Sequence, residues 1–131
     1  MNCSNHPASL EYTPENSMVL HTSRGTEVID WCTIIRVEAI GNYSKVFFAN
    51  GKTLVLAKVL AWFEEQMADK GFLRLHRSHL VNLRFVLRWD TENNASVILK
   101  NYYSLPVSRR KKRYCRQTIL QFYNGQPAFA A

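Results

Sequence analysis

The chain has 131 residues, enough for one domain with tails and too few for a second full-sized domain. Its 47% hydrophobic and 21% charged content is typical of a globular protein with its own buried core. No run of 18 apolar residues is present, and residues 1–17 lack the positive start and apolar stretch of a signal peptide. We therefore expect a cytoplasmic protein with no membrane partner.

The formal net charge of +7 is unevenly distributed along the chain. Residues 1–69 carry 5 basic and 8 acidic side chains, a net charge of −3. Residues 70–131 carry 12 basic and 2 acidic side chains, a net charge of +10. A strongly cationic half favours a polyanionic partner, and a nucleic acid fits better than an anionic membrane surface, which is the weakest alternative.

The elements expected from the pattern start after a polar tail, residues 1–17, and end before a second tail, residues 124–131. Asn50 and Gly51 join two β-rich runs and form the strongest short-range hairpin signal. Pro106 suits an edge strand because it cannot donate a ladder hydrogen bond. The expected strands are residues 18–23, 26–29, 34–40, 43–49, 52–56, 83–89, 95–100 and 103–107.

Two segments follow the helical period instead. Residues 59–70 place apolar side chains on one face, and Gly71 is a plausible stop. A second helix begins at Ser108, a good N-cap, with Cys115 and Ile119 on its apolar face. About eight strands and two helices predict a mainly β domain.

Cysteine usage argues against a disulfide framework or a zinc ribbon, because three cysteines are an odd number and none has Cys-x-x-Cys spacing. Cys32 and Cys115 fall on apolar faces and are expected to be unreactive core thiols.

Five consecutive cations occupy residues 109–113, at the start of the second predicted helix. Cations are disfavoured at that end of a helix dipole by roughly 0.3–1 kcal/mol each, whereas a phosphate there binds both the free backbone N–H groups and the cations. The alternative is a solvated basic surface.

In residues 72–82, alternation places Phe72, Leu75 and Leu80 inside and leaves Arg74, Arg77 and His79 for the surface. The three-residue spacing of two histidines invites a metal site, but no third or fourth ligand has suitable spacing, so we expect no metal and no cofactor.

Gly41 and Asn42 separate two expected strands, so Asn42, Tyr43 and Ser44 emerge at one end of a sheet. Asn suits adenine edges, and Tyr and Ser suit phosphates, although an ordinary turn is the better explanation of this stretch taken alone. No nucleophile elbow, phosphate-binding Gly-rich loop or paired carboxylates are present, so we do not expect an enzyme.

Over about residues 26–120, the order and spacing of these pieces resemble the LytTR family of bacterial DNA-binding domains. The matching stretches are Val37-Glu38-Ala39, Asn42-Tyr43-Ser44, the Asn50-Gly51 hairpin with its following helix, Phe72-Leu73-Arg74-Leu75-His76-Arg77-Ser78, Leu80-Val81-Asn82 and Leu105-Pro106-Val107-Ser108-Arg109-Arg110. The resemblance implies an elongated, β-sandwich-like fold of about eight to ten strands and two helices over residues 18–123.

The resemblance also implies a sequence-specific regulator that reads promoter direct repeats in double-stranded DNA through loops in successive major grooves. The implied base-reading residues are Asn42, Tyr43, Ser44, Arg77, Arg109 and Arg110. The implied contacts to the DNA backbone are Lys45, Arg74, Ser78, His79, Asn82, Ser108, Lys111, Lys112 and Arg113. A second protomer on the adjacent repeat and an unidentified signalling protein are candidate partners.

Some features depart from the family pattern. Asn101-Tyr102-Tyr103 replaces a Gly-containing turn, and because Asn101 can adopt the left-handed conformation a turn is still feasible there. The family's receiver domain has no room before the first strand, so a stand-alone regulator is expected. A basic RNA-binding module, or a protein-interaction module with a solvated cationic surface, is the alternative function.

Overall fold

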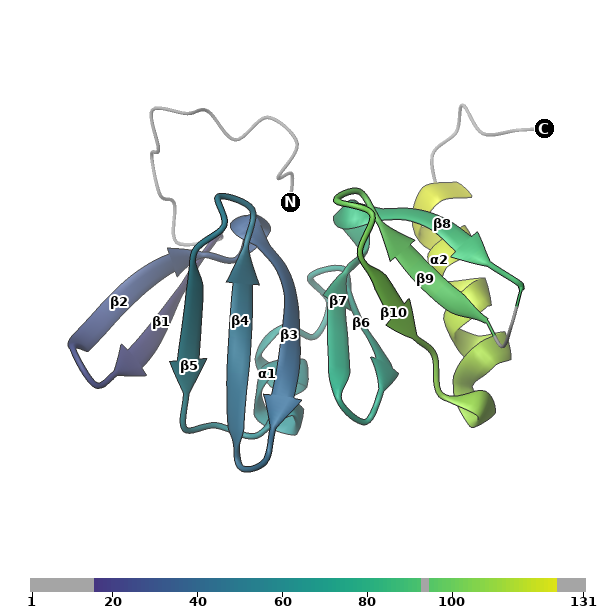
Figure 1. The fold of residues 1–131 in the computed structure, drawn as a ribbon. Helices are drawn as coiled ribbons and strands as arrows, with labels where there is room; N and C mark the ends of the chain where they lie inside the picture. Colours follow the sequence, from purple (N-terminus) through teal and green to yellow (C-terminus); the bar gives the residue numbers. More distant parts are fainter. Residues whose placement is uncertain (1–15, 93–94, 125–131) are drawn as a thin grey trace.

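The computed structural model describes residues 16–92 and 95–124, and within them ten strands form three antiparallel sheets beside two α-helices (Figure 1). Most of the two predicted tails lies outside these residues. The strands are β1 Ser17–Thr22, β2 Gly25–Asp30, β3 Ile34–Ile40, β4 Tyr43–Phe48, β5 Thr53–Leu56, β6 Phe72–His76, β7 His79–Asn82, β8 Val86–Asp90, β9 Ser96–Leu99 and β10 Ser104–Pro106. The helices are α1 Leu60–Gln66 and α2 Lys112–Asn124. The predicted mainly β fold is confirmed.

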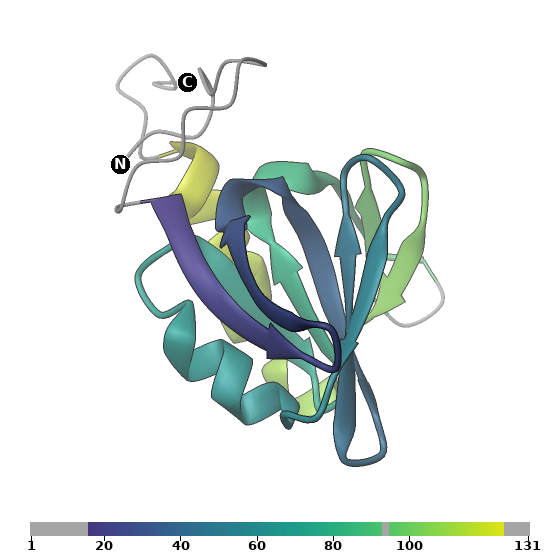
Figure 2. The same cartoon turned by 90° about the vertical axis from the view of Figure 1, so that its left-hand side faces the viewer.

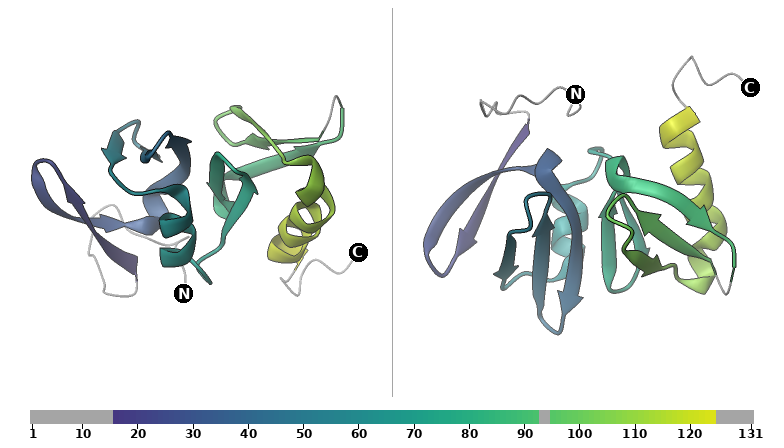
Figure 3. Two further views of the ribbon diagram at one scale, coloured as in Figure 1. Left: turned by 90° about the horizontal axis from the view of Figure 1, so that it is seen from below. Right: turned by 45° about the horizontal axis from the view of Figure 1, so that its top comes forward.

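The three sheets lie side by side, which gives the molecule its elongated form (Figure 1). The β1–β2 hairpin lies at one end, and the sheet of order β10-β9-β8 lies at the other. Between them is a five-stranded sheet of order β5-β4-β3-β7-β6, in which the β3–β7 pairing joins two hairpin units. Both helices lie on the same side of the sheets, as the side view and the view from below show (Figures 2 and 3).

Two apolar clusters form the core, and β7 contributes to both. Leu80 packs with Trp31, Val37 and Phe63 in the cluster under α1. The next residue, Val81, packs with the three-stranded sheet and α2. Because successive side chains of a strand point to opposite faces, one strand connects the two halves of the molecule.

Local signals predicted several elements well. The hairpin at Asn50 and Gly51 is present, with Gly51 at φ +92°, a conformation that favours glycine. Pro106 lies on β10, which pairs only with β9 and is therefore an edge strand. The second helix buries Cys115 and Ile119 as expected.

Other segments have different boundaries or turn conformations from those predicted. Helix α1 ends at Gln66, four residues early, and the following turn includes Asp69 at φ +68° and Gly71 at φ +82°. Residues 83–85 form a 3₁₀ turn, so β8 starts at Val86 and not at residue 83. The β9–β10 turn is present, and in it Tyr102, not Asn101, adopts the left-handed conformation, at φ +66°.

The buried residues of β6 differ from the prediction, and β3 departs from simple alternation. Leu73 and Leu75 are the buried residues of β6, whereas Phe72 is only partly buried. A bulge in β3 between Ile34 and Arg36 shifts its register, and Arg36 is buried. Its guanidinium is stable there because it stacks on Phe47 at 3.7 Å and bonds the Glu38 carboxylate at 2.8 Å.

The cysteine expectation holds for one residue only. Cys115 is a free, buried thiol, and burial raises its pKa. Cys32 is disulfide-bonded, so its prediction as a free thiol is wrong. In the described part of the chain, neither helix has the length and apolarity needed to cross a membrane.

Candidate nucleic-acid interface

Three connecting segments that carry predicted DNA-contact residues lie at one edge of the molecule, the lower edge in Figure 1: the β3–β4 turn, the β6–β7 turn and the segment after β10. Strands β3 and β6 both pair antiparallel with β7, so they run in the same direction and the turns that follow them lie at the same end of the sheet. The third junction follows β10, and there the Ser108 N–H donates to the Leu75 carbonyl at 2.8 Å. This edge therefore collects residues from positions 42, 77 and 109 of the chain.

Arg77 and Arg110 line one cavity, although 33 positions separate them in the sequence. The cavity has a volume of about 490 Å³, and Arg74, Ser108 and Lys111 complete its lining. A neighbouring hollow of about 340 Å³ is lined by His76, Ala95, Pro106, Val107, Ser108, Arg109 and Lys112. Neither lining includes a carboxylate, so cations and hydroxyls converge on a space that suits a bound anion.

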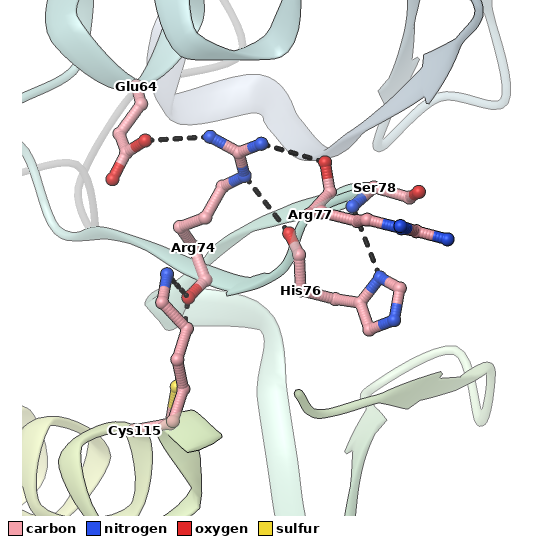
Figure 4. A network of polar contacts seen from close by, with 7 residues as sticks. Glu64, Arg74, His76, Arg77, Ser78 and Cys115 are labelled. Carbon is pink, nitrogen blue, oxygen red and sulfur yellow. Dashed lines mark hydrogen bonds and ion pairs between the residues drawn. The ribbon is translucent and has the colours of Figure 1, made fainter. Parts of the chain in front are cut away.

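Figure 4 shows how Arg74 holds the β6–β7 turn from inside. Its Nε donates to the His76 carbonyl at 3.0 Å, and its Nη2 donates to the Arg77 carbonyl at 2.7 Å. Its Nη1 bonds the Glu64 carboxylate of α1 at 2.8 Å. Arg74 was predicted to contact the DNA backbone, but its side chain is only 18% exposed and its hydrogen bonds go to the protein.

The β3–β4 turn offers two of its three predicted residues to solvent. Asn42 and Tyr43 are exposed, the latter by 52%. Ser44 is fully buried, and its hydroxyl donates to the Lys58 carbonyl at 2.6 Å. In this structure the side chain closes the connection from β5 to α1 and is not exposed to a base. Lys45 is half-buried, with its amine 5.2 Å from the centre of the Phe47 ring.

Asn82 and His79 are also less accessible than predicted. Asn82 is fully buried, its amide donates to the Ile34 carbonyl at 2.9 Å, and its Oδ1 accepts the Arg84 N–H. It cannot reach a phosphate in this fold. His79 is half-buried, and burial is the main cause that lowers its pKa, which disfavours a positive charge on its ring. Ser78 is half-buried, and its N–H donates to Nδ1 of His76.

The basic run 109–113 is split between a 3₁₀ turn, Arg109–Lys111, and the first turn of α2. Ser108 precedes the turn but makes no side-chain cap, so its hydroxyl is available to a ligand. Arg109, Arg110 and Arg113 are exposed, and Lys112 is half-buried. The Lys111 amine donates to the Arg74 carbonyl at 3.2 Å, which links this segment to β6.

The expectation that no metal is bound can be compared only with the described residues. Within residues 16–92 and 95–124, no group of three or more His, Cys, Asp and Glu side chains is placed to hold a metal ion. The rings of His76 and His79 lie 5.6 Å apart, and the ring of His76 accepts a backbone hydrogen bond.

Comparison with known proteins identifies the kind of domain that this chain forms. The sequence profile described as the LytTr DNA-binding domain matches residues 24–120, and no curated protein matches the chain. A solved LytTr DNA-binding domain of a methyl-accepting/DNA response regulator from Bacillus cereus has a TM-score of 0.67 with 24% identity. The likeness covers 79% of this chain and 96% of that chain, and at this identity it shows the fold alone. Because the profile spans most of the chain, the protein belongs to the LytTr family, a family of DNA-binding domains and not of enzymes.

Proposed function

We propose that the protein is a transcription regulator that binds double-stranded DNA sequence-specifically through its lower edge. The observation that carries the proposal is the convergence of Arg77 and Arg110 on one cavity without a carboxylate. Arginine can bind O6 and N7 of guanine bidentately, which discriminates between bases by roughly 1–3 kcal/mol. The exposed base-reading candidates are Asn42, Tyr43, Arg77, Arg109 and Arg110.

The remaining polar groups of the edge are assigned to the DNA backbone. They are Lys45, Ser78, Ser108, Lys111, Lys112 and Arg113, all at least partly exposed. Contacts of this kind position a protein on the duplex without reading sequence.

The elongated arrangement supports a separate role for each junction. The β3–β4 turn and the 3₁₀ turn at Arg109–Lys111 lie at different points along the edge in Figure 1. We assign them to successive major grooves, with the backbone contacts across the minor groove between them. The proposed targets are direct repeats in promoters, occupied by two protomers, and the proposed location is the cytoplasm.

The test is fluorescence anisotropy on DNA selected from a random pool and on a scrambled duplex. Arg110→Ala should lower the affinity for selected DNA by about tenfold or more, because one bidentate base contact is lost, and should lower the affinity for scrambled DNA far less. Lys100→Ala is the matched control, since it removes one exposed positive charge from the β9–β10 end of the molecule. Equal losses of affinity for both duplexes would show that Arg110 contacts a phosphate and does not read a base.

The same titration tests the alternative functions. Log affinity for DNA should fall linearly with log salt, because each neutralised phosphate releases counterions. Tighter binding to a matched RNA duplex would favour the RNA-binding alternative. Absence of binding to either nucleic acid would favour a protein-interaction module, with an unidentified signalling protein as the first candidate partner.

A further inference from the structure

We propose that Arg74 is a positioning residue that sets the relative placement of the two DNA-contacting segments, around Arg77 and Arg110, without contacting DNA itself. The proposal rests on the function proposed above and assigns a role that the exposed residues do not have. It departs from the sequence-based prediction that Arg74 binds the DNA backbone.

The side chain of Arg74 orders the β6–β7 turn. Two of its nitrogens bond the successive carbonyl groups of His76 and Arg77, and a third bonds Glu64 on α1. These bonds draw the backbone of the turn inward, and in Figure 4 the side chain of Arg77 extends away from the Arg74 guanidinium. A planar guanidinium satisfies this geometry, because its donors are fixed in one plane.

The main chain of residues 74 and 75 orders the second segment. The Arg74 carbonyl accepts from the Lys111 amine at 3.2 Å and from the Cys115 thiol at 3.7 Å. The next carbonyl, that of Leu75, accepts the Ser108 N–H at 2.8 Å. Two neighbouring residues of β6 therefore hold both segments. The side chain of Arg74 orders the turn that bears Arg77, and the backbone carbonyls of residues 74 and 75 bond the segment that bears Arg110.

The charge of Arg74 is already balanced within the protein. Its Nη1 lies 2.8 Å from the Glu64 carboxylate, and the side chain is 18% exposed, against an exposed Arg77 beside it. A phosphate would have to compete with this ion pair. The role that fits the contacts is preorganisation: a turn that is ordered before binding does not lose its backbone freedom on DNA, which is worth roughly tenfold in affinity per ordered residue.

The first experiment measures DNA affinity for Arg74→Gln, Arg77→Ala and the double variant. Arg74→Gln should lower the affinity for selected DNA about tenfold and change the affinity for scrambled DNA by no more than about twofold. The slope of log affinity against log salt should stay unchanged. In the Arg77→Ala background, Arg74→Gln should have no further effect on selected DNA, because Arg74 acts through Arg77. Equal weakening on both duplexes, a salt slope lower by about one, or additive losses in the double variant would each overturn the proposal.

Two conservative variants separate geometry from charge. Arg74→Lys keeps the charge without the planar fork, so it should behave like Arg74→Gln. Glu64→Gln should give a smaller loss of the same kind, because it removes one anchor of the guanidinium. Glu65→Gln is its matched control, an exposed neighbour on α1 whose side chain has no hydrogen bond among the described residues. A wild-type affinity for Arg74→Lys would contradict the geometric role.

A measurement without DNA keeps this proposal separate from the proposed function. In the free protein, the Ser78 amide donates to the ring of His76, and the Ser78 carbonyl accepts the Ala39 N–H. Arg74→Gln should speed hydrogen exchange at Ser78 and Ala39 while thermal melting confirms a folded protein. Unchanged exchange refutes the positioning role. Wild-type protein that does not prefer selected DNA refutes the proposed function instead.

Discussion

Asn82 provides a sharp test of the interface, because the structure moves it from the DNA backbone into the core. It ends β7, is fully buried and lies 48 positions along the chain from its main partner, Ile34. Its amide donates to the carbonyl of Ile34, and its Oδ1 caps the 3₁₀ turn by accepting the Arg84 N–H at 3.1 Å. We predict that Asn82→Ala destabilises the fold and leaves the DNA contacts of the folded protein intact.

The magnitude follows from the bonds that are lost. The Ile34 carbonyl is left unpaired in the core, at a cost of about 1–3 kcal/mol. Loss of the cap costs about 1 kcal/mol more. The total of about 3 kcal/mol corresponds to a decrease in Tm on the order of 10–20 °C for a domain of this size.

The assay is thermal and urea denaturation, with DNA affinity measured at a temperature where both proteins are folded. Asn42→Ala is the matched control, because this exposed asparagine should lose DNA affinity with little change in Tm. If Asn82→Ala melts within about 2 °C of wild type and its salt slope falls by about one, Asn82 is a phosphate contact and our reasoning about its burial is wrong.

Three further predictions concern titratable groups that are buried or half-buried. Burial lowers the pKa of His79 below 6.5, so the unfolded chain binds its proton more readily; stability should be full above pH 6.5 and decline as pH falls toward the lowered pKa. Melting at pH 7.5 and 5.5 measures this, and His79→Gln should reduce the decline. The buried thiol of Cys115, whose pKa is raised, should react slowly with iodoacetamide at pH 7.5 and much faster in urea; fast native alkylation at that peptide would contradict its burial. Tyr123→Phe removes a hydroxyl that donates to the Leu83 carbonyl, and should lower stability by about 1 kcal/mol in urea titrations. An unchanged midpoint would mean that the bond makes no net contribution.

The elements that the sequence predicted well depend on neighbouring residues. The turn at Asn50 and Gly51 needs positive φ, and Pro106 lacks the donor that a central strand requires. The spacing of Cys115 and Ile119 defines one face of α2. In each case the physical cause acts within one turn or one strand, so it can be read from the local sequence.

The candidate site was predicted less completely, because residue type does not reveal which polar groups are used inside the protein. Arg77 and Arg110 are exposed as expected. Ser44, Arg74 and Asn82 have equally suitable side chains, yet their partners are protein groups. Those partners are 14, 10 and 48 positions away, and no local pattern predicts contacts at such separations.

The sequence by itself determined both helices and most of the strands, although not β6 and β7, together with the cationic second half of the chain and the motifs that identify the family. Only the tertiary structure decided which of these polar residues face solvent and which of them meet. The β3–β7 and β6–β7 pairings bring the turns after β3 and β6 to one edge, and the contacts of Arg74 bring the run at 109–113 beside Arg77. The physical reason is that backbone pairing and burial depend on the whole chain, whereas propensity and charge belong to single residues and their neighbours.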